Sequence, residues 1–150
     1  MLNPSAEENT LQSLGKLFGC AIRSTTCLPL DLCPAFFQQL RHGSEAFLKL
    51  VGSDRVDGPP TAALRELRTF DASAATLLAF EDPSTSRAYD EKEFAALELT
   101  YTTYLTGATR VELVPGGAAL RVAFADRWRY SRMVLRARFE EGARALKLMK

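Results

Sequence analysis

The chain has 150 residues, of which 47% are hydrophobic and 25% charged, with nine Gly and seven Pro. This composition is that of an ordinary globular domain, and it excludes collagen-like, coiled-coil and wholly disordered chains. A chain of this length can remove roughly 70% of its unfolded surface from water, so it needs no metal or disulfide to hold a core.

The charge is unevenly distributed, although the formal net charge is only +1. Residues 1–126 carry 11 basic and 16 acidic side chains, whereas residues 127–150 carry 8 basic and 2 acidic ones. A basic tail is compatible with nucleic-acid binding. These Arg residues, however, alternate with apolar residues at helical spacing, which favours a solvated helix face. Nucleic acid is therefore the least favoured partner.

The sequence indicates an intracellular chain. It has no run of 18 apolar residues and no Lys or Arg before Lys16, so neither a spanning helix nor a secretory signal is indicated. Cys20, Cys27 and Cys33 are odd in number and lack CxxC spacing, which favours a reducing compartment. We interpret them as small core residues and expect a cytoplasmic protein, with the nucleus as the alternative and no membrane partner.

The first element is a predicted amphipathic helix over 5–23. Ser5 and Glu8 form an S-x-x-E capping box, and apolar residues then recur every three or four positions. The apolar face is wider than this chain is expected to cover, so Leu11 and Phe18 should stay partly exposed or be buried by a second copy. Self-association through exposed apolar faces is therefore expected.

Two shorter helices and a boundary follow. Proline in a first turn and an apolar run predict a helix over 34–40, and a capping serine predicts another over 44–51. The stretch 52–60 is rich in Gly, Pro and Asp, which predicts turns and a subdomain boundary.

One continuous helical pattern runs from Thr61 through Leu78 and stops at a predicted loop over 82–90. Asp90 and Glu93 then form a second capping box for a short helix.

In the last third of the chain, the sequence pattern repeats every two residues instead of every three or four. Segments 99–105, 109–114 and 119–124 are rich in β-branched and aromatic residues, which predicts three short antiparallel strands. Asp126 is placed to cap a long final helix. The predicted fold class is α+β, mainly helical with a small antiparallel β-sheet before a long C-terminal helix.

The residues alone indicate no catalytic, metal or cofactor site. His42 is the sole histidine, and no Ser, Cys or acidic residue stands at the spacing of a known catalytic motif. His42 and the three Cys could supply four zinc ligands, but no CxxC pair supports this. Residues 115–117, Pro-Gly-Gly, lack the Lys-Ser/Thr of a P-loop and are predicted to be a turn.

Four segments, in this order and spacing, resemble sequences of one protein family. They are residues 14–22, 30–40, 64–71 and 111–117, which read LGKLFGCAI, LDLCPAFFQQL, LRELRTFD and VELVPGG. They resemble the LG-x-L-x-G-x-A helix, the LDL helix after it, the L-x-x-L-x-x-L-D helix entry and the V-E-L-x-P-G-G stretch of the HECT-type ubiquitin-protein ligases. Among members of this family, the sequence most resembles the very large ones that contain a propeller.

The resemblance implies that this is the latter part of the family's N-terminal lobe. Residues 1–58 would be the end of its large subdomain, 59–128 the small subdomain that docks the ubiquitin-conjugating enzyme, and 129–150 the returning helix. The chain stops before the lobe that carries the family's active-site cysteine, so we expect no ubiquitin transfer by this chain alone. The implied partners are a conjugating enzyme and the missing lobes of the parent protein.

The family's docking groove is apolar, and the resemblance carries it over to named positions here. They are Leu77, Leu78, Leu97, Leu99 and Tyr130, with Phe70, Ala74 and Phe80 as candidates that depend on the register of the docking helix. The alternative is a non-catalytic interaction module in which the same residues are internal packing, since apolar residues at helical spacing usually belong to a core.

Overall fold

The computed structural model of this chain describes residues 7–25, 58–69, 71–82, 85, 87–105 and 108–148. The helices predicted over 34–40 and 44–51 lie outside these residues, and the boundary at 52–60 is described only from residue 58. The other predicted features that lie outside them are Ser5 of the first capping box, Cys27, Cys33, His42 and Phe70.

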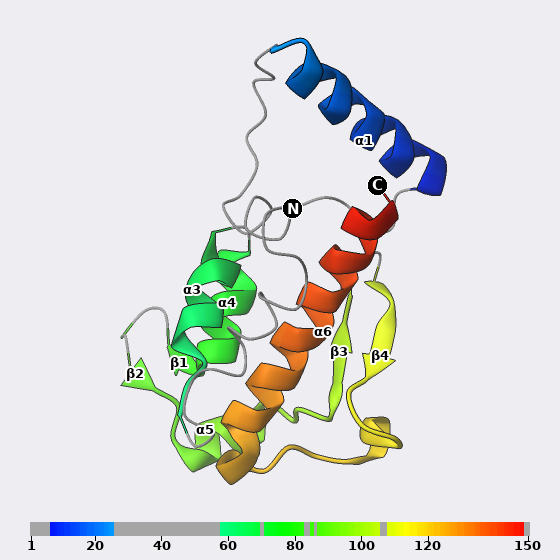
Figure 1. Ribbon diagram of the computed structural model, residues 1–150. Coiled ribbons are helices and arrows are strands. Elements are labelled where there is room, and N and C mark those ends of the chain that lie inside the picture. Colours follow the sequence, from blue (N-terminus) through cyan, green and yellow to red (C-terminus); the bar gives the residue numbers. More distant parts are fainter. Residues whose placement is uncertain are drawn as a thin grey trace.

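The architecture is a long C-terminal helix with helices on one side and a small β-ladder on the other. The elements are α1 (Glu8–Arg23), α3 (Thr61–Arg68), α4 (Ala72–Ala79), β1 (Glu81–Asp82), β2 (Arg87–Ala88), α5 (Glu91–Ala96), β3 (Thr102–Tyr104), β4 (Arg110–Glu112) and α6 (Arg127–Leu148). In Figure 1, α3 and α4 flank one side of α6, and β3 and β4 lie on the other. The predicted α+β class, mainly helical with a long final helix, is confirmed.

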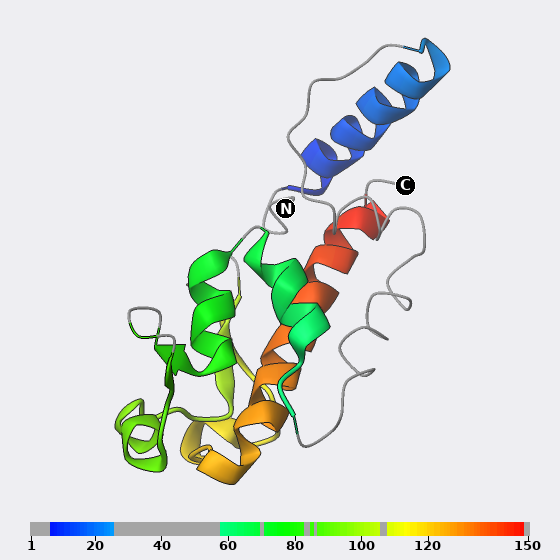
Figure 2. The same ribbon diagram turned by 90° about the vertical axis from the view of Figure 1, so that its left-hand side faces the viewer.

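Helix α1 begins at Glu8, three residues after its predicted start. Its N-cap is Glu7, which makes no side-chain capping bond. The N-terminal end of α1 lies beside the C-terminal end of α6, and the rest of α1 extends away from it (Figure 2).

This placement decides which apolar residues of α1 are covered. Leu11 is only 2% exposed, so the prediction that it stays exposed is wrong, because the N-terminal half of α1 meets α6. Phe18 is half-buried, whereas Ile22, one turn of the same face further along, is 77% exposed. Cys20 is exposed as well, so its interpretation as a core residue is wrong.

The helix predicted from Thr61 through Leu78 is two helices, because Asp71 starts a new one. Asp71 has non-helical backbone angles, φ −144° and ψ 78°, and its Oδ1 accepts a hydrogen bond from the Ala74 amide at 2.9 Å. Its Oδ2 pairs with Nη1 of Arg138 on α6 at 2.6 Å. The capping bond satisfies an amide that a helix start would otherwise leave unpaired, and the ion pair fixes the break against α6.

Helix α4 ends at Phe80, which closes it in the left-handed conformation with φ 51° and ψ 47°. The Phe80 carbonyl then accepts a hydrogen bond from the Tyr89 amide at 3.0 Å. This bond sits beside a two-residue antiparallel hairpin, β1–β2, inside the segment predicted as a loop. The Asp90–Glu93 capping box of α5 is confirmed, with both reciprocal bonds present.

Strands β3 and β4 pair antiparallel, as predicted, but are shorter than their sequence segments. The third predicted strand, 119–124, is reduced to a single bridge between Thr100 and Arg121. Two 3-10 turns, Gly117–Ala119 and Phe124–Asp126, occupy the two ends of this segment and leave only a short extended stretch between them.

The predicted turn at 115–117 is confirmed, and Glu112 holds it. The Glu112 carboxylate accepts hydrogen bonds from the Gly116 amide at 3.1 Å and the Ala118 amide at 3.3 Å. Gly116 has φ +70°, and a Cβ on Gly117 would lie 2.3 Å from the Tyr101 carbonyl oxygen. Glycine is therefore required at 117 by the close approach of two backbones.

We predict that Gly117→Ala lowers the free energy of unfolding by about 1–3 kcal/mol, because the new methyl group must displace the Tyr101 backbone. Gly19→Ala is the matched control, since a Cβ at that position would meet no described atom within 4 Å apart from its chain neighbours and the backbone of its own helix. It should leave stability unchanged or raise it by up to about 1 kcal/mol. Urea denaturation followed by circular dichroism measures both, and equal effects would contradict this account.

A second prediction separates the two roles of Asp71. Asp71→Ala removes the cap and leaves the partly buried Arg138 without its partner, and should cost about 1–2 kcal/mol of stability. Asp71→Asn keeps a capping oxygen and should cost clearly less. If both variants lose the same stability in urea denaturation, the cap contributes nothing.

Candidate functional site

The structure separates the predicted docking positions by exposure. Leu78, Phe80 and Tyr130 are buried, with exposed fractions of 3%, 2% and 7%. Ala74, Leu97 and Leu99 are partly buried and pack against the same core. Leu77 is 47% exposed.

Two of the buried positions, Phe80 and Tyr130, belong to an aromatic cluster with Phe94 and Trp128. The Phe80 ring meets that of Phe94 edge to face at 5.1 Å, and those of Trp128 at 5.8 Å and Tyr130 at 6.5 Å. Because these rings come from the end of α4, from α5 and from α6, the cluster joins three helices. The cluster belongs to the core against which the buried face of α4 packs.

Tyr130 is held in this cluster by a buried hydrogen bond. Its hydroxyl donates to the Thr102 carbonyl at 3.1 Å, which ties α6 to β3. Burial raises the pKa of Tyr130, and the positive charge of Arg138 opposes part of that shift. The pKa of Tyr101 is also raised, first by burial and then by the negative charge of Asp126.

A hollow of about 390 Å³ lies on the outer face of α4. We call it the α4 hollow, and it is lined by Ala72, Ser73, Thr76, Leu77, Glu81 and Tyr89. The four helical members share one face of α4, while Ala75, Leu78 and Ala79 on its other face are buried. The lining is mainly apolar, with a few hydroxyl groups and one carboxylate.

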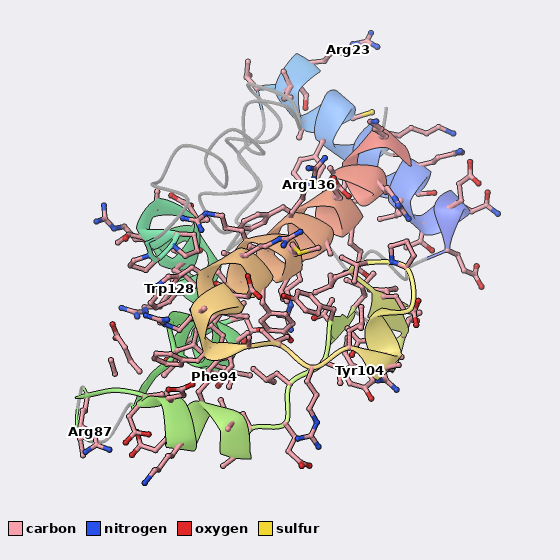
Figure 3. All side chains as sticks on the ribbon, turned by 90° about the horizontal axis from the view of Figure 1, so that it is seen from below. Arg23, Arg87, Phe94, Tyr104, Trp128 and Arg136 are labelled. Carbon is pink, nitrogen blue, oxygen red and sulfur yellow. The ribbon has the colours of Figure 1, made fainter. Side chains whose placement is uncertain are left out.

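The Arg-rich helix α6 uses several of its charges within the chain. The Arg127 guanidinium lies 4.0 Å from the ring centre of Phe124 and 4.8 Å from that of Trp128. Arg136 pairs with Glu140 at 2.8 Å. Arg23 on α1 and Arg87 on β2, which pairs with Glu93, lie at opposite edges of the view in Figure 3.

Within the described ranges, no three His, Cys, Asp or Glu side chains are grouped as a metal site would require. None of the helices in those ranges combines the length and the apolar character needed to cross a membrane.

A family model, the HECT-domain (ubiquitin-transferase) model, matches residues 1–149. The chain belongs to the HECT-domain family. The resemblance drawn from the four sequence segments is thereby confirmed, and the family implies a ubiquitin-conjugating enzyme as a partner in general terms. No solved structure matches the chain.

Sequence reasoning on this HECT-domain chain anticipated Leu77 but missed the rest of the α4 hollow. The small residues Ala72, Ser73 and Thr76 share the face of Leu77 at helical spacing, and this pattern could have indicated a shallow depression. Tyr89 carried no local signal, because a backbone bond to Phe80 brings it beside α4.

We predict that Tyr130→Phe lowers stability by about 1 kcal/mol at neutral pH, because the bond to Thr102 is lost. The raised pKa means that the folded state disfavours the Tyr130 phenolate. Its contribution to stability is complete below the ordinary value near 10 and is lost as the pH rises through the folded-state pKa. The difference between wild type and Tyr130→Phe should therefore shrink or reverse as the pH rises above the ordinary tyrosine pKa of about 10 in urea denaturation. A difference independent of pH would contradict the assignment.

Proposed function

We propose that this chain docks a ubiquitin-conjugating enzyme on the outer face of α4, as part of a HECT-type ubiquitin ligase. The observation that carries the proposal is Leu77, a leucine 47% exposed at an apolar hollow, next to Leu78, which is 3% exposed. Membership of the HECT-domain family supports a conjugating enzyme as the occupant. The proposal assigns residues 59–128 to the docking subdomain.

The α4 hollow suits one apolar side chain of a partner. Its volume of about 390 Å³ lies in the range of small-ligand pockets, which run from roughly 300 to 1,000 Å³. An apolar anchor that fills such a hollow usually provides much of the binding energy of an interface. The Ser73 and Thr76 hydroxyls and the Glu81 carboxylate offer polar contacts at its edge.

The core packing behind α4 favours binding to its outer face without rearrangement. Leu78 and Phe80 are fixed in the core, and the buried Ser131 hydroxyl donates to the Leu78 carbonyl at 3.0 Å. A surface that is already ordered loses little conformational entropy when a partner binds.

The alternative function, a structural module whose apolar positions are internal packing, is favoured by burial at some of the same positions. Leu78, Phe80 and Tyr130 have the exposure of core residues. In our proposal they support the docking face from below, and Leu77 with its hollow makes the contact. The two functions therefore differ in what Leu77 does.

We predict that Leu77→Ala weakens binding of a ubiquitin-conjugating enzyme about tenfold, equivalent to about 1.4 kcal/mol, with no loss of folded structure. Isothermal titration calorimetry measures the affinity for conjugating enzymes tested one at a time, and circular dichroism checks the fold. The matched control is Leu17→Ala on α1, because Leu17 is 51% exposed and lies on a helix distant from α4 in Figure 1.

Equal affinities of the Leu77 and Leu17 variants would place the binding surface elsewhere. Absence of binding by the wild type to every conjugating enzyme tested would support the structural module.

A further inference from the structure

A second hollow adjoins the first, and the two share Glu81. It has a volume of about 240 Å³, and we call it the α3 hollow. It is lined by Pro59, Thr61, Leu64, Arg65, Arg68, Ala79 and Glu81. Because β1 follows α4 directly, Glu81 stands between the apolar hollow on α4 and a hollow whose wall is the outer side of α3.

The α3 hollow carries two cations without partners in the described part of the chain. Arg65 and Arg68 are three residues apart on α3, so they lie on one face of the helix, and both are exposed. Neither forms an ion pair with another described residue, and the same is true of Glu81.

These arginines differ from others on the surface. Arg87 pairs with Glu93 and Arg121 pairs with Glu98, so those positive charges are matched within the chain. At the α3 hollow two guanidinium groups face one carboxylate, which leaves an excess of positive charge. The floor beneath them is apolar, since Leu64 is 6% exposed and Ala79 is 8% exposed.

We propose that the α3 hollow binds an acidic side chain of the conjugating enzyme whose apolar anchor fills the α4 hollow. The inference rests on the proposed function and adds a determinant of specificity to it. A partner segment seated on the α4 hollow continues past Glu81 onto Arg65 and Arg68, because the two hollows meet at that residue. A partner with a basic side chain at that point is repelled.

The chemistry of arginine favours a carboxylate as the occupant. A guanidinium group presents a planar set of donors that matches the two oxygens of a carboxylate, and such charge-assisted bonds are stronger than neutral ones. Complementary charges at the edge of an interface act mainly on the association rate and on the choice between partners. The α3 hollow should therefore discriminate between conjugating enzymes that share the same apolar anchor.

The test uses the full chain and the conjugating enzyme that binds the wild type most tightly. We expect Arg65→Glu with Arg68→Glu to lower its affinity about tenfold at low ionic strength, with a smaller loss at high salt. The control is Arg23→Glu with Arg110→Glu, which changes the net charge equally at exposed positions on α1 and β4. The control pair should change the affinity less than twofold.

A charge reversal in the partner identifies the contact. Changing the acidic residue nearest the anchor of the conjugating enzyme to arginine should weaken binding to the wild type and restore binding to the double Glu variant. Should the Glu variant unfold, as judged by circular dichroism, Arg65→Gln with Arg68→Gln replaces it, with about threefold loss expected.

The outcomes separate this inference from the proposed function. If Leu77→Ala weakens binding but the α3 variants match the control pair, or no charge reversal restores affinity, the inference fails and docking on α4 stands. If Leu77→Ala binds as tightly as the wild type, the docking surface itself is misplaced and the inference fails with it.

Discussion

Phe80, at the end of α4, links this helix to α5 and α6 in the described part of the HECT-domain chain. Its backbone adopts a left-handed conformation. For a residue with a Cβ that conformation costs about 1–2 kcal/mol. The ring offsets the cost, because it is 2% exposed and contacts Phe94 of α5 and both Trp128 and Tyr130 of α6. Its carbonyl binds the Tyr89 amide, so the same residue also positions the β1–β2 hairpin.

The inward position of Phe80 decides what α4 presents to solvent. With Leu78 and Phe80 in the core, the face of α4 that carries Leu77 must point outward. The hairpin returns Tyr89 to that face and places Glu81 at its edge, which completes the α4 hollow. One buried aromatic side chain therefore organises both the core and the proposed docking surface above it.

Three carboxylates stabilise the helix starts and the turn around this core, and each of them makes two interactions. Asp71 caps α4 and pairs with Arg138, whereas Glu112 accepts two amides of the turn that brings Gly117 against Tyr101. Glu93 completes the capping box of α5 and pairs with Arg87 on the hairpin. By contrast, Arg65 and Arg68 have no such partner among the described residues, which is why the α3 hollow stands out as a surface for an external acid.

The sequence by itself determined the features that depend on near neighbours along the chain. The Asp90–Glu93 capping box, the turn at 115–117, the β3–β4 pairing and the long α6 were predicted because their hydrogen bonds and periodicity are local. The HECT family was likewise recognised from residue order, and Leu77 was named among the docking positions. Only the tertiary structure decided the break at Asp71, the burial of Leu11, the exposure of Cys20 and the shortening of the third strand. It also decided which of two adjacent leucines faces solvent. The helix break, the burial of Leu11 and the burial of Leu78 depend on contacts with α6, which is distant from them in sequence.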